Sequence, residues 1–120
     1  MKKKEILIVE DEFVSYMHVK ILLEKNGYST EDICRSGEDA VNRINGSKPD
    51  LIIMDIILDG DIDGIEAAKQ IRTRYDIPII FLTASSDEFT CKRALEVTMA
   101  GYIRKPFNKH ELFDKVEAAI

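Results

Sequence analysis

Residues 51–55 read Leu-Ile-Ile-Met-Asp, four consecutive apolar side chains followed by a carboxylate. A strand with one face in water alternates apolar and polar residues, whereas a strand buried on both faces is apolar throughout. The segment is therefore predicted to be a strand of a parallel sheet that helices cover on both sides. Residues 6–9 and 79–82 have the same continuous apolar character and are predicted to be strands of the same kind.

Two further segments, residues 29–34 and 101–103, are more mixed and are predicted to be strands nearer the sheet edges. The segments between the strands carry apolar residues at helical spacing. The predicted buried stripes are Val14, Met17 and Ile21; Ala40, Val41 and Ile44; Ile65, Ala68, Ile71 and Tyr75; Cys91, Ala94 and Leu95; and Leu112, Phe113, Val116 and Ile120. Five strands alternating with five helices predict an α/β fold, a doubly wound parallel sheet in a single domain of residues 1–120.

The composition narrows the class of protein. The chain has 120 residues and a formal net charge of −5, with one short basic run at residues 2–4, so binding to nucleic acid is not expected. Cys34 and Cys91 form no C-x-x-C pair and are expected to be reduced thiols. The apolar run at residues 6–9 is too short for a signal peptide, and no run approaches the length of a membrane span, so a cytoplasmic location is expected.

Polar residues follow the predicted strands at the end where ligands bind in such folds. Glu10 and Asp11 follow the first strand and Asp55 follows the third. Carboxylates gathered at one rim repel one another, and a hard cation such as Mg²⁺ compensates their charge. Asp11 and Asp55 are predicted to bind the ion directly, and Glu10 directly or through water.

The same rim is predicted to hold a phosphoryl-transfer site. Asp55 ends a buried strand, and an aspartate carboxylate can act as a nucleophile that forms an aspartyl phosphate. Lys105 follows the fifth strand and offers an ammonium group suited to a phosphate oxygen. Thr83 follows the fourth strand and could donate a hydrogen bond to a second oxygen. Together these groups would balance the charge that develops during in-line transfer.

Five motifs carry a resemblance to a known family: IVEDE at 8–12, IIMDI at 52–56, DGIE at 63–66, FLTA at 81–84 and GYIRKPF at 101–107. Their order and spacing resemble the receiver domain of two-component response regulators over essentially the whole chain. The resemblance implies a flavodoxin-like sheet with strand order 2-1-3-4-5. It implies that Asp55 accepts a phosphoryl group from a phosphohistidine of a sensor histidine kinase or a histidine phosphotransfer protein.

The resemblance also implies roles for further residues. Glu10, Asp11, Asp55 and the backbone carbonyl of Ile57 would hold Mg²⁺, with Mn²⁺ able to take its place. Lys105 would contact the phosphoryl group. The Lys105–Pro106 peptide bond would be cis. Thr83 and Tyr102 would form the switch, which alters the surface of the fourth helix, fifth strand and fifth helix. That surface would bind an unidentified downstream protein or a second copy of the chain. Direct binding to nucleic acid or to a membrane is not expected. The domain would catalyse only its own phosphorylation and dephosphorylation.

The loop after Asp55 departs from the family pattern. Asp59 stands where a proline is usual, and the Asp63-Gly64 pair comes one residue later than usual, so the shape of this loop is left open. Ile57 and Ser85 occupy the positions that tune dephosphorylation in the family. Neither is an acid or an amide that could hold an attacking water, so a long-lived phosphoryl group is predicted.

Three other functions match part of the sequence pattern. The residues Asp59, Asp61 and Asp63 match the D-x-D-x-D-G start of a calcium-binding loop, but its twelfth position is Gln70 instead of glutamate. A haloacid-dehalogenase-like phosphatase would need an Asp-x-Asp pair after the first strand, where this chain has adjacent Glu10 and Asp11. The third alternative is an interaction domain that is never phosphorylated. The presence of the acidic pair, Asp55 and Lys105 together argues against this alternative.

Overall fold

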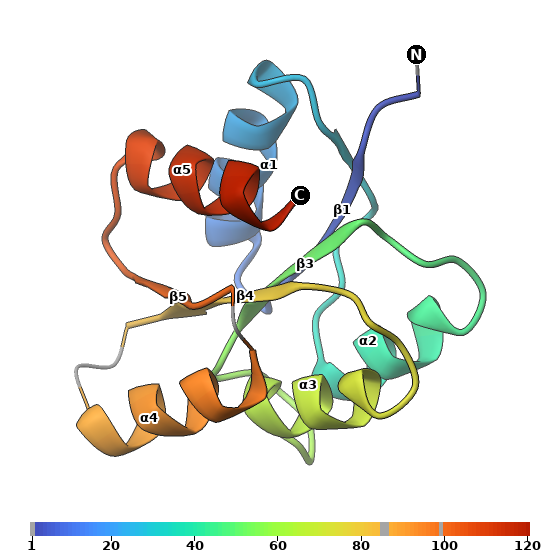
Figure 1. Cartoon of the computed structure of the whole chain (residues 1–120), viewed down its shortest axis with the longest axis vertical. Helices are drawn as coiled ribbons and strands as arrows, with labels where there is room; N and C mark the ends of the chain where they lie inside the picture. Colours follow the sequence, from blue (N-terminus) through green and yellow to red (C-terminus); the bar gives the residue numbers. More distant parts are fainter. Residues whose placement is uncertain (1, 85–86, 99) are drawn as a thin grey trace.

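The computed structural model describes residues 2–84, 87–98 and 100–120. Strands and helices alternate through these residues, and five parallel strands form one sheet in the order β2-β1-β3-β4-β5 (Figure 1). The predicted fold class and strand order are therefore confirmed. The elements are β1 (Glu5–Val9), α1 (Phe13–Lys25), β2 (Ser29–Thr30), α2 (Gly37–Ile44), β3 (Leu51–Asp55), α3 (Gly64–Arg72), β4 (Ile79–Thr83), α4 (Glu88–Val97), β5 (Tyr102–Arg104) and α5 (Lys109–Ala119).

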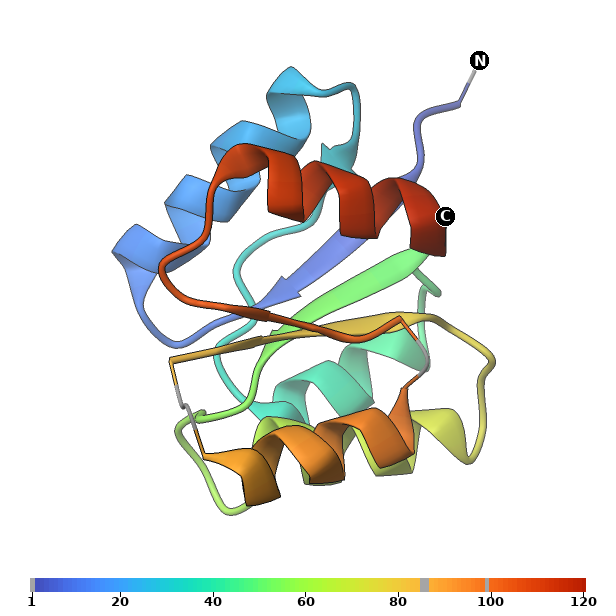
Figure 2. The same ribbon diagram turned by 60° about the vertical axis from the view of Figure 1, so that its left-hand side comes forward.

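Helices cover both faces of the sheet. Helices α1 and α5 lie on one face and α2, α3 and α4 on the other, which Figure 2 shows as two layers around the strands. Successive strand residues point to opposite faces. Ile6 and Ile8 accordingly pack toward α1 and α5, while Leu7 and Val9 pack with the residues of α2 to α4. Because both faces are covered, every residue of β3 and β4 is buried.

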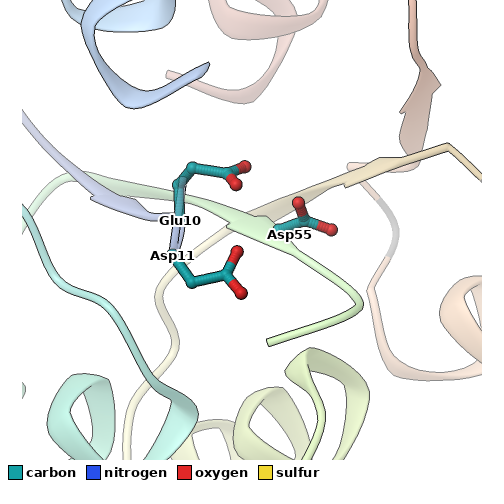
Figure 3. A group of neighbouring side chains, drawn as sticks. All are labelled: Glu10, Asp11 and Asp55. Atoms are coloured by element: carbon teal, nitrogen blue, oxygen red, sulfur yellow. The ribbon is translucent and has the colours of Figure 1, made fainter. Parts of the chain in front are cut away.

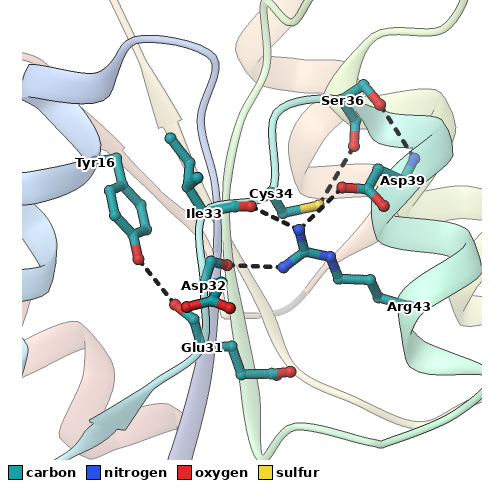
Figure 4. Close-up of polar contacts among 8 residues, drawn as sticks. All are labelled: Tyr16, Glu31, Asp32, Ile33, Cys34, Ser36, Asp39 and Arg43. Carbon is teal, nitrogen blue, oxygen red and sulfur yellow. Dashed lines mark hydrogen bonds and ion pairs between the residues drawn. The ribbon is translucent and has the colours of Figure 1, made fainter.

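The second strand is shorter than predicted. Residues 29–34 were expected to form it, but β2 ends at Thr30, and only an isolated bridge between Val9 and Cys34 continues the pairing. Side chains hold the segment that follows (Figure 4). The Tyr16 hydroxyl donates to the Glu31 carbonyl at 2.9 Å, and Arg43 donates to the carbonyls of Asp32 at 2.8 Å and Ile33 at 2.6 Å. These bonds give hydrogen-bond donors to three consecutive carbonyls of a segment that does not continue the strand.

The buried face of α1 also differs from the prediction. Val14 is 82% exposed and Ile21 is 45% exposed, so the predicted stripe of Val14, Met17 and Ile21 is wrong; Met17 is partly buried. The helix buries Tyr16, Val19 and Leu23 instead. Apolar residues occur on every side of this helix, so helical spacing alone supports more than one face. The sheet and α5 select the face that packs.

Two smaller differences from the predicted stripes lie in the last part of the chain. Leu95 of α4 and Ile120 at the chain end are exposed, whereas Cys91, Ala94, Leu112 and Val116 are buried. Ser36 caps α2 by accepting from the Asp39 amide, and Asn108 caps α5 by accepting from the Glu111 amide. None of the helices in the described ranges has the length and apolar character needed to cross a bilayer.

Candidate functional site

Three carboxylates meet at the carboxyl ends of β1 and β3. The two strands are adjacent and parallel, and Val9 pairs with Met54, so the residues that follow each lie side by side. Oxygens of Glu10, Asp11 and Asp55 all lie within 4.8 Å of one another. Figure 3 shows the three side chains together at this edge of the sheet. Among the described residues, no other group of three or more acidic, His or Cys side chains is this close.

Lys105 joins the cluster from the loop after β5. Its Nζ lies 2.8 Å from Asp55 Oδ2 and 3.0 Å from Glu10 Oε2. The Glu10 side chain is 1% exposed and the Asp55 side chain 10% exposed, so both ion pairs are shielded from water. Burial by itself lowers the pKa of Lys105, but the hydrogen bonds and charges of Asp55 and Glu10 outweigh it and raise that pKa. Lys105 is therefore a fixed positive charge at the site.

The three acids carry more negative charge than Lys105 can balance. Burial, followed by the hydrogen bond and charge of Asp55, raises the pKa of Glu10 to about 7. The donor set consists of carboxylate oxygens, the ligands that Mg²⁺ prefers. The residues present therefore fit a divalent cation, because a second positive charge would offset the remaining repulsion.

Backbone contacts hold Asp55 in place. The Ile57 amide donates to Asp55 Oδ1 at 3.1 Å, and the Gly64 amide donates to the Ile56 carbonyl at 2.7 Å. A methyl group on Gly64 would overlap the Asp55 carbonyl oxygen, so a glycine is needed there. The Lys105 amide donates to the Thr83 carbonyl at 2.8 Å, which fixes the lysine loop to the end of β4.

The other predicted site residues lie around this cluster. Thr83 is 1% exposed and ends β4, one residue beyond the position that pairs with Asp55. Tyr102 begins β5 and packs, partly buried, against the core on the α2–α4 face. Ile57 follows Asp55 with its side chain 67% exposed, and Ser85 lies outside the described residues. The Lys105–Pro106 bond is cis, as the resemblance implied.

The candidate calcium loop is not gathered into a site. In the described ranges, Asp59, Asp61 and Asp63 do not form a group close enough to share an ion. The Asp63 carboxylate instead accepts from the Glu66 amide at 2.8 Å, which caps α3, and lies 3.6 Å from Arg93 of α4. The loop therefore uses Asp63 to begin a helix.

The sequence analysis did not identify two residues that contact the acidic loops after β1 and β3. One residue lies in α2 and the other in the segment just before it. Arg35 donates to the Asp11 carbonyl at 3.2 Å, and Glu38 Oε1 accepts from the Ile62 amide at 2.9 Å. The two partners of each contact are 24 positions apart in the sequence, so no local sequence pattern predicts the contact. Gly60, whose φ of 106° favours glycine, was the one available signal of a special conformation in the second loop.

Comparison with known proteins agrees with this geometry. Residues 6–117 match the family of the response regulator receiver domain. The signal receiver domain of a modulated diguanylate cyclase from Desulfovibrio desulfuricans is 36% identical with a TM-score of 0.91, covering 99% of this chain and 94% of that one.

Two more solved structures are similar. The N-terminal domain of a response regulator/sensory box/GGDEF three-domain protein from Carboxydothermus hydrogenoformans is 38% identical, with a TM-score of 0.87 and coverage of 97% and 93%. A two-component response regulator from Clostridium difficile is 32% identical, with a TM-score of 0.89 and coverage of 98% and 95%. With a family match over nearly its whole length and the acidic cluster at the expected edge of the sheet, this chain belongs to the response regulator receiver domains of two-component signalling.

Proposed function

We propose that this receiver domain takes a phosphoryl group onto Asp55 from a phosphohistidine of a partner protein, in a reaction that requires Mg²⁺. The observation that carries the proposal is the contact of one lysine, Lys105, with both Asp55 and Glu10 at a rim where three carboxylates converge. Such an arrangement is costly in charge repulsion unless a ligand uses it. A phosphoryl group bound with a divalent cation would use both kinds of charge. The cation would contact the carboxylates, and the phosphoryl oxygens would contact Lys105.

The chemistry follows from the residues present. A carboxylate oxygen of Asp55 attacks phosphorus, a new O–P bond forms, and the P–N bond to the donor imidazole breaks with its electron pair returning to nitrogen. Lys105 gives up part of its contact with Asp55 and turns its ammonium toward the phosphoryl oxygens. A bound Mg²⁺, held by Glu10, Asp11, Asp55 and the Ile57 carbonyl, with Mn²⁺ as a substitute, would neutralise negative charge that Lys105 alone cannot balance.

Signal output would use Thr83 and Tyr102. Thr83 lies on the neighbouring strand, one residue beyond the position that pairs with Asp55. Tyr102 is partly buried and packs against the core on the α2–α4 face. We propose that phosphorylation shifts the population between two packings of β4, β5 and α4, and that the surface of α4, β5 and α5 then binds a downstream protein or a second copy. We further propose that residues 1–120 act as one receiver unit.

The direct test is incubation with acetyl phosphate and Mg²⁺ followed by intact mass measurement. Wild type is expected to gain one phosphoryl group, and chelation of the metal is expected to prevent the gain. Asp55→Asn has nearly the same shape but no nucleophilic carboxylate, so it should gain none. Equal phosphorylation of both proteins would exclude Asp55 as the acceptor.

A further inference from the structure

The loop of residues 56–63, between β3 and α3, is attached to the start of α2. Glu38 of α2 accepts a hydrogen bond from the Ile62 amide at 2.9 Å. A parallel bridge between Ser36 and Asp59 brings the same two segments together. Two contacts therefore join this loop to the start of α2.

Gly60 completes the contact. Its φ of 106° lies in the region that favours glycine, and a methyl group there would overlap Glu38 Oε2. The Glu38 carboxylate therefore lies directly against the Gly60 backbone while its other oxygen accepts from Ile62. The two oxygens of Glu38 thus meet two points of this loop, the Gly60 backbone and the Ile62 amide.

The attached loop leads directly from Asp55. The Ile57 amide donates to the Asp55 carboxylate at 3.1 Å, and the loop closes where the Gly64 amide meets the Ile56 carbonyl at 2.7 Å. The segment before α2 also reaches the other acidic strand end, because the Glu10 amide donates to the Cys34 carbonyl at 2.8 Å. One stretch, residues 34–38, thus contacts both loops that carry the acids.

We propose that Glu38 is a positioning residue for this site: its carboxylate holds the loop of residues 56–63 in the conformation in which Asp55 and the Ile57 backbone bind the divalent cation. The inference rests on the proposed function and extends it to a residue that does not itself reach the cation or the phosphoryl group. Groups that orient metal ligands by hydrogen bonding affect metal affinity strongly without contacting the metal.

The alternative is that Glu38 acts only through its negative charge near the acidic rim. Glu38→Gln separates the two effects, because the amide oxygen can still accept from Ile62 although the charge is gone. Glu38→Ala removes both the acceptor and the charge.

The experiment measures the Mg²⁺ dissociation constant by calorimetry and the hydrogen exchange of the Ile62 amide by NMR. Glu38→Ala is expected to weaken Mg²⁺ binding about tenfold and to speed exchange at Ile62, since loss of an orienting hydrogen bond costs roughly that much affinity. Glu38→Gln should bind Mg²⁺ within about threefold of wild type, because its acceptor remains. Glu96→Ala removes an exposed glutamate from α4 and serves as the charge-matched control with unchanged affinity.

The inference is overturned if Glu38→Ala speeds exchange at Ile62 while Mg²⁺ affinity stays at the wild-type value, or if Glu38→Gln binds as weakly as Glu38→Ala. Failure of wild type itself to bind Mg²⁺ would instead overturn the proposed function.

Discussion

At the residue scale, Lys105 is the group on which the charges of the site depend. Its ammonium contacts two carboxylates that are otherwise buried together, at 2.8 Å and 3.0 Å. Removing one partner of a buried charge group leaves the others without compensation. The lysine is therefore expected to serve both the resting site, where it balances Glu10 and Asp55, and the reaction, where it would balance the phosphoryl oxygens.

Replacing Lys105 by methionine keeps the length of the side chain and removes its charge. We expect Lys105→Met to slow phosphorylation of Asp55 by about a hundredfold, since loss of one stabilising group at a reacting centre costs at least that much. The rate is measured from the time course of intact mass with acetyl phosphate and saturating Mg²⁺. Lys109→Met, at an exposed position on α5, is the control, and equal rates in all three proteins would remove Lys105 from the mechanism.

At the element scale, the close approach of α3 to the end of β3 shapes the site. Gly64 begins α3, and its missing side chain lets the helix start against the Asp55 carbonyl. We expect Gly64→Ala to destabilise the fold by about 1–3 kcal/mol, because the added methyl group forces the backbone to move. Urea unfolding measures the loss. Gly46→Ala, which meets nothing closer than 3.8 Å, should change stability far less, and similar losses at both positions would contradict this account of Gly64.

The face of α1 gives a second prediction at this scale. Leu23 is fully buried, whereas Val14 is 82% exposed although both belong to the same apolar helix. Leu23→Ala is expected to lower the free energy of unfolding by about 2–5 kcal/mol through loss of packing. Val14→Ala should change it by less than about 0.5 kcal/mol, as is usual for an exposed position. The opposite ranking in thermal unfolding would mean that the helix packs by the face first expected from the sequence.

These elements show what the sequence could predict. The strands β1, β3 and β4 were predicted to within a residue, because burial on both faces leaves a continuous apolar run between polar ends. The end of β2 was not predictable, because Tyr16 and Arg43 satisfy the following carbonyls from distant positions. The buried face of α1 was ambiguous because apolar residues occur on every side of that helix.

The site shows the same division. Glu10, Asp11, Asp55 and Lys105 could be brought together from the sequence, because each follows a strand and parallel strands place these ends at one edge. The hold of Glu38 on the loop could not, because it joins residues 24 positions apart through a side chain and a backbone amide. Local patterns predict which residues face the site, while tertiary contacts decide how firmly they are held.

At the scale of the whole molecule, the acidic cluster is a source of strain that ligand binding relieves. The chain has a net charge of −5, and three of its carboxylates are crowded at one end of the sheet. Like charges at this separation oppose folding, whereas a cation that binds only the folded state favours it. Global stability should therefore depend on the divalent cation.

We expect Mg²⁺ to stabilise wild type against unfolding by about 2.7 kcal/mol at a concentration one hundred times its dissociation constant. Asp11→Asn removes one of the crowded charges, so it should be more stable than wild type in chelator and gain less from Mg²⁺. Urea unfolding with and without the metal measures both effects. Asp114→Asn, at an exposed position on α5, should respond to Mg²⁺ as wild type does. A wild type whose stability does not depend on Mg²⁺ would argue against the cation site.

The central claim is that the phosphoryl group resides on one carboxylate at the end of β3. Treating the phosphorylated protein with borohydride converts an aspartyl phosphate to homoserine, and peptide mapping by mass spectrometry then locates the modified position. The account predicts homoserine at position 55, produced only when Mg²⁺ and the phosphodonor are both present. Modification at Asp59, Asp61, Asp63 or a histidine, with residue 55 unchanged, would contradict it.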